Sequence, residues 1–192
     1  MRFSYHAEQW LSYPSGLVFE FFANPDNLPL LIPPWQTTRI EKVSILPPPH
    51  QPDISSSASP AAGVGTRFTL SFRPFPFSPV RFRWEAEITE FSWNHHFCDE
   101  QIHGPFARWK HCHYIRPVRW QGLNATLVAD HIEYDVPFGA AGRLAHRLFL
   151  RGQIERTFAY RQIQINKILA KITSQSRESQ SDEAAPPGRA SA

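Results

Sequence analysis

The chain has 192 residues, of which 42% are hydrophobic and 19% charged, and this is the size and composition of one ordinary globular domain. It has 20 Lys and Arg against 17 Asp and Glu, and a net charge of +3 spread over a whole domain makes a poor phosphate-binding surface, so we expect no nucleic-acid partner. Aromatic side chains are abundant, with 15 Phe, 6 Trp and 5 Tyr, and rings in this number are expected to line a core or a cavity.

The start of the chain and the two cysteines indicate the compartment. Residues 1–10 contain no apolar signal region, and no segment approaches the roughly 18 apolar residues that a membrane span needs. Cys98 and Cys112 are too few for the disulfide scaffold of a secreted protein, so they fit a reduced chain. We therefore expect a cytoplasmic protein with no integral membrane contact.

The N-terminal part is expected to hold one strand and two short helices. Residues 3–12 have the composition of a strand, and a short apolar helix follows at 17–23. A second short helix is expected to begin near Asn24, a residue that favours helix caps. It ends by Ile32, because two prolines follow that residue and a helix cannot continue through them.

Six further strands are expected in the middle of the chain. Each is rich in β-branched or aromatic residues and is bounded by Pro, Gly or Asn. Apolar and charged side chains alternate most clearly along 80–91, so one face of the sheet is apolar and the other solvated. A flexible inserted loop, rich in Pro and Ser, is expected at 47–62. The six expected strands are 37–46, 64–73, 80–91, 94–103, 106–118 and 125–137.

A long amphipathic helix is expected to close the fold. Apolar residues recur every three or four positions from about residue 140 to 172, opposite Arg and Gln. Residues 173–192 contain no large apolar side chain, so we expect a disordered tail there. The expected fold is one α+β domain over residues 1–172, in which a seven-stranded curved antiparallel sheet wraps around the C-terminal helix and two short helices follow the first strand.

The hairpin over residues 94–115 is expected to place a row of polar residues on the apolar face. A turn at Gly104 and Pro105 sets Asp99 opposite His111, and on the other face it sets Cys98 opposite Cys112. This register also brings Glu100 across from Lys110, whereas a slip by one residue would mix the two faces. The row on the inward face is Phe97, Asp99, Gln101, Trp109, His111 and His113.

The next hairpin is expected to pair His113 with Asp130. A turn around Gly122 sets these two residues opposite each other, and Asp130 shares its face with Ile132 and Tyr134. A carboxylate in an apolar row needs a partner, and an imidazole supplies both a hydrogen bond and a counter-charge. The sequence therefore predicts a His113–Asp130 pair.

Three interpretations of this polar row stay open. It can be a satisfied network that fixes the strand register, it can recognise the polar end of a mostly apolar ligand, or it can catalyse proton transfer through a histidine backed by an aspartate. A metal site built on His111 and His113 is geometrically possible, but each histidine already has a carboxylate opposite it, so we expect no metal. Gly-rich phosphate loops are absent from the sequence, so we also expect no nucleotide cofactor.

Three stretches of the chain resemble one known superfamily. They are VFEFFANPDNLPLLIPPW at 18–35, DEQIHGPFARWKHCHYI at 99–115, and DHIEYDVPFGAAGRLAHRLFLRGQIERTFAYRQ at 130–162. They are similar to segments of the START-like (SRPBCC) helix-grip superfamily, which includes the birch-pollen-allergen fold, polyketide cyclases and dehydrases, and many bacterial ligand-binding proteins. The resemblance implies a deep apolar cavity between the sheet and the C-terminal helix that holds a hydrophobic small molecule, but it implies no single chemistry.

The function expected from these observations is the carriage or sensing of a hydrophobic or amphipathic small molecule, without a cofactor. The alternative is a polyketide-cyclase-like or dehydrase-like enzyme that uses His113 with Asp130, or His111 with Asp99, for proton transfer. The expected ligand-binding residues are Trp84, Asp99, Gln101, Trp109, His111, His113, Asp130, Tyr134 and Phe158.

Overall fold

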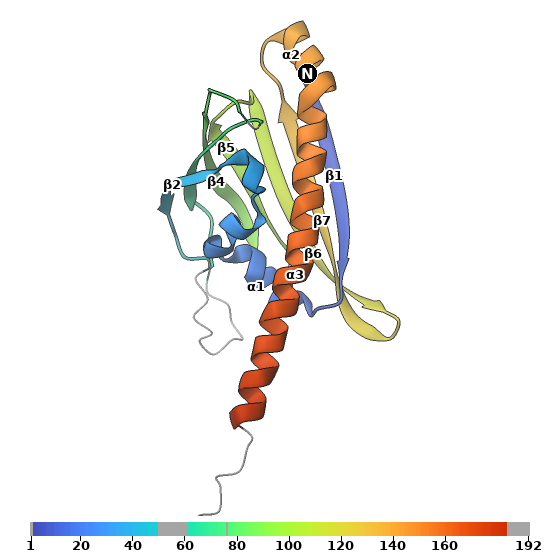
Figure 1. Cartoon of the computed structure of the whole chain (residues 1–192). Helices are drawn as coiled ribbons and strands as arrows, with labels where there is room; N and C mark the ends of the chain where they lie inside the picture. The colour runs from blue at the N-terminus through green and yellow to red at the C-terminus, as the bar shows by residue number, and fades with distance from the viewer. Residues whose placement is uncertain (1, 50–60, 76, 184–192) are drawn as a thin grey trace, which may run out of the picture.

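Seven antiparallel strands form one sheet in the computed structural model, which describes residues 2–49, 61–75 and 77–183 (Figure 1). The order across the sheet is β1-β7-β6-β5-β4-β3-β2, so six strands form a meander and β1 is added beside the last of them. The expected seven-stranded α+β fold is therefore confirmed. The strands are β1 (Arg2–Leu11), β2 (Arg39–Ser44), β3 (Arg67–Phe72), β4 (Phe82–Ser92), β5 (His96–His103), β6 (Arg108–Trp120) and β7 (Leu123–Asp135).

Short helices carry the chain from one edge of the sheet to the other. The helix α1 (Ser15–Ala23) is followed by two 3-10 helices, η1 (Pro25–Leu31) and η2 (Pro34–Gln36), before β2 begins at the far edge. The Asn24 side chain caps η1 by accepting a hydrogen bond from the Asp26 backbone N–H at 2.9 Å. The two expected short helices are present, and the short η2 turn follows them.

The C-terminal helix runs along the inner face of the sheet (Figure 1). It begins with α2 (Gly139–Ala145), passes through one π-helical turn, η3 (His146–Leu150), and continues as α3 (Arg151–Glu183). Side-chain amides tie α3 to the β1 edge, because Gln9 Nε2 donates to the Gln162 carbonyl at 2.7 Å and Gln162 Nε2 donates to the Glu8 carbonyl at 3.1 Å. The helix therefore covers the β1 and β7 half of the sheet directly.

Two core clusters hold these layers together. One joins α1 to β5, β6, β7 and α3, around the fully buried Phe19 and Leu169. The other joins α3 to β6 and β7, through Ile154 and Phe158 against Trp109 and Ile132. These side chains leave water on folding, and the burial of each large apolar side chain stabilises the fold by about 1.5–3 kcal/mol.

The C-terminal helix ends later than predicted, and parts of the expected tail and loop lie outside the described residues. The expected end of the fold at residue 172 is wrong for the helix, because α3 continues to Glu183. Residues 173–183 contain no Gly or Pro to end a helix, and the lack of apolar residues removes tertiary packing but not helical propensity. Residues 184–192 of the expected tail, and 50–60 of the expected loop at 47–62, lie outside the described residues.

The expectation of reduced cysteines is also wrong. Cys98 and Cys112 lie directly opposite each other on β5 and β6, as the register predicted, and a disulfide joins them. Directly opposed residues of neighbouring strands lie close enough for their sulfurs to meet. Because disulfides persist mainly in oxidising compartments, the cysteines no longer support a cytoplasmic location. No helix of the described part of the chain is both long and apolar enough to span a membrane.

Candidate functional site

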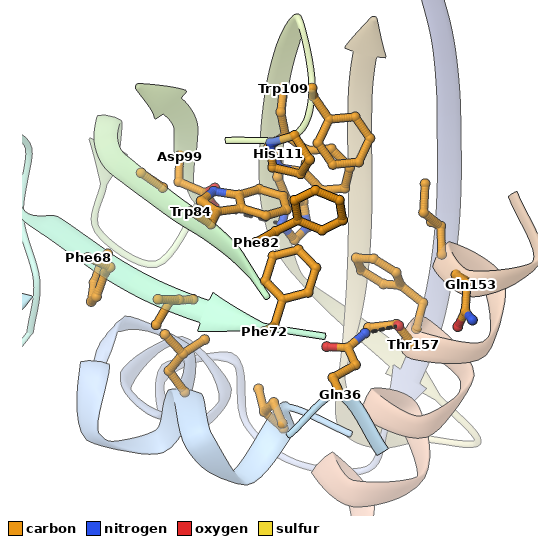
Figure 2. Close-up of a pocket in the computed structure, with 18 of the residues that line it drawn as sticks. Gln36, Phe68, Phe72, Phe82, Trp84, Asp99, Trp109, His111, Gln153 and Thr157 are labelled. Carbon is orange, nitrogen blue, oxygen red and sulfur yellow. Dashed lines mark hydrogen bonds and ion pairs between the residues drawn. The ribbon is translucent and has the colours of Figure 1, made fainter. Parts of the chain in front are cut away.

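A cavity of about 960 Å³ lies between the inner face of the sheet, the short helices and α3 (Figure 2). Its walls come from β3, β4, β5 and β6 and not from β1 or β7, because α3 packs directly on those two strands. Large aromatic side chains dominate the lining. Six of them are Phe68, Phe72, Phe82, Trp84, Trp109 and Phe158.

The aromatic rings form a connected layer on the sheet side of the cavity. Trp84 meets Trp109 edge to face with 4.9 Å between ring centroids, and Phe106 packs on Trp109 at 4.7 Å. Phe72 continues the layer toward β3, 5.9 Å from Trp84. Contacts of this type stabilise the wall beyond the area that they bury, so the cavity surface is ordered before a ligand enters.

The cavity has a polar link at the α3 side and an exposed rim. Gln36 Nε2, on η2, donates to Thr157 Oγ1 on α3 at 2.9 Å, as the dashed line in Figure 2 marks. Four aromatic residues both line the cavity and face solvent, with exposed fractions of 37% for Phe82, 52% for Phe75, 85% for Phe138 and 69% for Phe149. Side chains that do both mark the mouth of a cavity.

Four polar residues on three adjacent strands form one cluster at the cavity wall. Asp99 on β5 lies opposite His111 on β6, and His113 lies opposite Asp130 on β7, so both predicted registers are confirmed. His113 Nδ1 is 2.7 Å from Asp130 Oδ1, which confirms the predicted pair. His111 Nε2 also contacts Asp130 Oδ1 at 2.9 Å, whereas its Nδ1 is 3.7 Å from Asp99 Oδ1. Asp130 therefore holds both imidazoles, and Asp99 faces only one of them.

The contacts of this cluster differ in hydrogen-bond geometry. His111 Nε2 and Asp130 are aligned for a hydrogen bond. His113 Nδ1 is close to the same carboxylate, but no aligned hydrogen-bond partner for this nitrogen exists among the described residues. The separation of 3.7 Å between His111 Nδ1 and Asp99 is too long for a hydrogen bond. The cluster is thus only partly satisfied by its own members.

Burial sets the charge state of the cluster. Desolvation lowers the pKa of His111 to about 4 and also lowers the pKa of His113, so both imidazoles are neutral near pH 7. Burial raises the pKa of the Asp99 carboxyl, which is partly open to the cavity but enclosed by protein. Burial alone would raise the pKa of Asp130 as well, yet the contacts with His113 and His111 hold it well below its usual value.

The structure brings six of the nine expected ligand-binding residues to the cavity and leaves three outside it. Asp130 lies behind the two histidines. Gln101 Nε2 donates to the Phe106 carbonyl at 2.8 Å, which closes the β5–β6 hairpin. Tyr134 lies under α3, and its hydroxyl shares a hydrogen bond of 2.8 Å with His146 Nε2. The six that line the cavity are Trp84, Asp99, Trp109, His111, His113 and Phe158.

Sequence reasoning missed several polar residues that line the cavity, and two of them, His146 and Arg161, carry ionisable side chains. His146, 9% exposed, stacks on Phe3 with 3.7 Å between ring centroids, and burial lowers its pKa. It falls on the same helical spacing as Ile154 and Phe158, and that spacing was the available signal. Arg161 places its guanidinium carbon 4.9 Å from the Phe158 ring, and its buried Nε has no hydrogen-bond partner among the described residues. Arg161 lies three residues after Phe158 and four before Ile165, so the same spacing was the signal for it.

Three of the polar residues are spaced as metal ligands can be. Asp99, His111 and His113 each offer one ligand atom, and these atoms all lie within 4.8 Å of one another. Two imidazole nitrogens and one carboxylate oxygen are a donor set that suits zinc and similar divalent ions.

No family model and no curated protein matches this chain in sequence, but solved structures match its fold. A point mutant of norcoclaurine synthase from Thalictrum flavum, in complex with a transition-state analogue, is similar with a TM-score of 0.59 and 15% identity, over 90% of this chain and 97% of that one. The ZhuI aromatase/cyclase from Streptomyces sp. R1128 is similar with a TM-score of 0.59 and 12% identity, over 87% and 93%. A START superfamily protein from Mycobacterium smegmatis gives a TM-score of 0.55 and 10% identity, over 88% and 98%.

These likenesses extend over nearly the whole of each chain, so they concern the entire fold and not one motif. Identities this low establish a fold and carry no activity with them. Together with the seven-stranded antiparallel sheet and the long C-terminal helix, they confirm the fold that the resemblance implied: the chain has a helix-grip fold like that of START/SRPBCC proteins.

Proposed function

We propose that this protein binds a hydrophobic or amphipathic small molecule in the cavity between the sheet and α3, and that it carries or senses this ligand. The observation that carries the proposal is the cavity itself, with a volume of about 960 Å³ and a largely aromatic lining. Ligand sites in proteins typically have volumes of about 300–1,000 Å³, apolar walls and a few convergent polar groups. Protein interiors are close-packed, so a cavity of this volume indicates a space that a ligand fills.

The lining favours a ligand with rings and one polar group. The layer around Trp84 and Trp109 offers ring faces and edges for stacking. The polar side chains at the wall include Asp99, His111 and Arg161, and the buried Nε of Arg161 lacks a hydrogen-bond acceptor among the described residues. An oxygen on the ligand would supply that acceptor. The expected ligand is therefore an aromatic or polycyclic molecule with a carbonyl, phenolic or carboxyl oxygen.

The test is to fill the cavity and measure the binding of an amphipathic aromatic probe, 8-anilinonaphthalene-1-sulfonate. Ala86 lies on β4, is 8% exposed and lines the cavity, so Ala86→Phe places a ring inside it. Thr89 is exposed on the same strand, and Thr89→Phe is the matched control. We expect saturable binding of one probe per chain by the wild type and by Thr89→Phe, and binding at least tenfold weaker by Ala86→Phe. Equal binding by all three proteins would show that the probe does not use the cavity and would overturn the proposal.

A second candidate is a cyclase-like or dehydrase-like enzyme. Its support is that His111 lines the cavity between two carboxylates, and that norcoclaurine synthase and an aromatase/cyclase share the fold. In this case a histidine of the cluster would move a proton on a carbonyl-containing substrate. Turnover of such a substrate by the wild type, lost in His113→Ala while probe binding persists, would favour the enzyme over the carrier.

A further inference from the structure

The polar cluster at the cavity wall contains more hydrogen-bond acceptors than donors. Its only side chains able to donate through an N–H are the two imidazoles, whereas the two carboxylates offer four oxygen atoms. Only one contact, between His111 Nε2 and Asp130, is aligned as a hydrogen bond. His113 Nδ1 is buried with no aligned partner among the described residues, and His111 Nδ1 is 3.7 Å from Asp99. Buried carboxylates without enough donors are costly, so the cluster lacks a positive group.

The charged groups near the cluster favour the binding of a cation. Arg161 interacts electrostatically with both Asp99 and Asp130, and it contributes one positive charge against two negative ones. The two carboxylates of Asp99 and Asp130 therefore outnumber the one guanidinium of Arg161, which leaves an excess of negative charge at this wall. A divalent cation at the wall would be attracted by this charge and would satisfy the lone pairs that the imidazoles leave free.

The geometry around the two histidines matches a metal site with a supporting residue. Ligand atoms of Asp99, His111 and His113 lie within 4.8 Å of one another, and all three residues line the cavity. Asp130 lies behind them and contacts one ring nitrogen of each imidazole, at 2.9 Å and 2.7 Å. Histidine ligands in proteins commonly direct their second nitrogen to a carboxylate, which fixes the ring orientation and makes the ligand more basic.

We propose that Asp99, His111 and His113 bind a divalent transition-metal ion of the zinc type at the cavity wall, with Asp130 as a positioning residue for both imidazoles. This site goes beyond the proposed function, since it is defined without the organic ligand. Three protein ligands leave a coordination position open, and that position faces the cavity because its three ligands line it. A bound ion would present a Lewis-acidic position to an oxygen of the molecule in the cavity.

The test measures zinc binding to the untagged full chain after treatment with EDTA. Isothermal titration with ZnCl2 is expected to give one ion per chain, and CoCl2 is expected to give visible absorption bands of a four- or five-coordinate ion. Asp99→Asn removes a ligand whose side chain is 23% exposed, so it is the variant that perturbs the fold least. It is expected to weaken zinc binding at least tenfold, as is His113→Asn, and Asp130→Asn is expected to weaken it about 10–100-fold.

The matched control is the other histidine pair of the sheet. His6 and His131 lie on the solvated face with 4.5 Å between ring centroids, and they could bind zinc adventitiously. His131→Asn is expected to leave the affinity unchanged. The proposal is overturned if no stoichiometric zinc binds, or if binding survives Asp99→Asn and His113→Asn but is lost in His131→Asn. Probe binding measured on the same samples separates the two proposals, because the cavity can accept the probe with or without an ion.

Discussion

Replacing the carboxylate that contacts both histidines should destabilise the fold strongly. Asp130 is 7% exposed, and its Oδ1 lies 2.9 Å from His111 and 2.7 Å from His113. In Asp130→Asn the side chain keeps its size but loses its charge, so the oxygen that both imidazoles contact becomes a weaker, neutral acceptor. A hydrogen bond to a charged group contributes about 1.5–3 kcal/mol. We expect a loss of about 3 kcal/mol.

The assay is urea unfolding at pH 7, with Glu133→Gln as the control. Glu133 is exposed on the same strand and makes no contact comparable with that of Asp130. For a slope of about 2 kcal/mol per molar urea, a loss of 3 kcal/mol lowers the midpoint by about 1.5 M, whereas an exposed substitution changes stability by less than about 0.5 kcal/mol. If Asp130→Asn behaves like Glu133→Gln, the carboxylate does not hold the two imidazoles and the reasoning is refuted.

The pH dependence of this difference has a definite sign. The contacts with His113 and His111 hold the folded pKa of Asp130 well below the ordinary value of 3.8, so the folded protein keeps the carboxylate ionised at pH values where the unfolded chain takes up a proton. Its stabilising contribution is therefore complete above pH 3.8 and is lost as the pH falls toward the lower folded pKa. The gap between wild type and Asp130→Asn should persist at pH 5 and shrink only below pH 3.8.

Three other predictions follow from single features. A Cβ at Gly152 in α3 would meet nothing within 4 Å, so Gly152→Ala should stabilise the protein by about 0.5–1 kcal/mol, measured as a higher urea midpoint; a lower midpoint would mean that the helix needs glycine there. The Cys98–Cys112 disulfide closes a loop with a sequence separation of 14, and its reduction by dithiothreitol should cost about 3 kcal/mol of stability; an unchanged midpoint would contradict this. Burial keeps the folded pKa of His146 below 6.5, so an NMR titration should place its midpoint below that value. Stability should fall as the pH drops below 6.5, because only the unfolded chain gains the proton. A midpoint at or above 6.5 would refute the assignment.

The strand registers were predictable because local chemistry fixes them. The turn at Gly104 and the charge pair of Glu100 with Lys110 leave only one register that separates the two faces of the β5–β6 hairpin. The same reasoning placed His113 opposite Asp130.

The sequence did not predict which of the inward residues reach the cavity. Alternation assigns a side chain to a face but says nothing of what covers that face. Asp130 and Tyr134 are inward as expected, yet Asp130 lies behind the two histidines and Tyr134 lies under α3, so neither lines the cavity. The second contact of Asp130, to His111, is a diagonal one, and pairing rules name only the residue directly opposite.

Other differences come from properties that composition does not determine. The register placed Cys98 opposite Cys112, but the number of cysteines gave no information on whether they are joined. The helix end was placed at the last apolar residue, although helix propensity alone carries α3 eleven residues further, to Glu183. The cavity position of Arg161 was also missed. A long basic side chain on a helix is usually solvated, although its spacing from Phe158 places Arg161 on the apolar face.

The most direct test of cavity binding is native mass spectrometry of the purified protein, followed by denaturing extraction and identification of any small molecule that it carries. The account predicts one hydrophobic or amphipathic molecule per chain in the wild type and much less in Ala86→Phe, whose added ring occupies the cavity. An identical co-purified molecule at equal occupancy in both proteins would contradict the account, as would a wild type that is empty and takes up no 8-anilinonaphthalene-1-sulfonate.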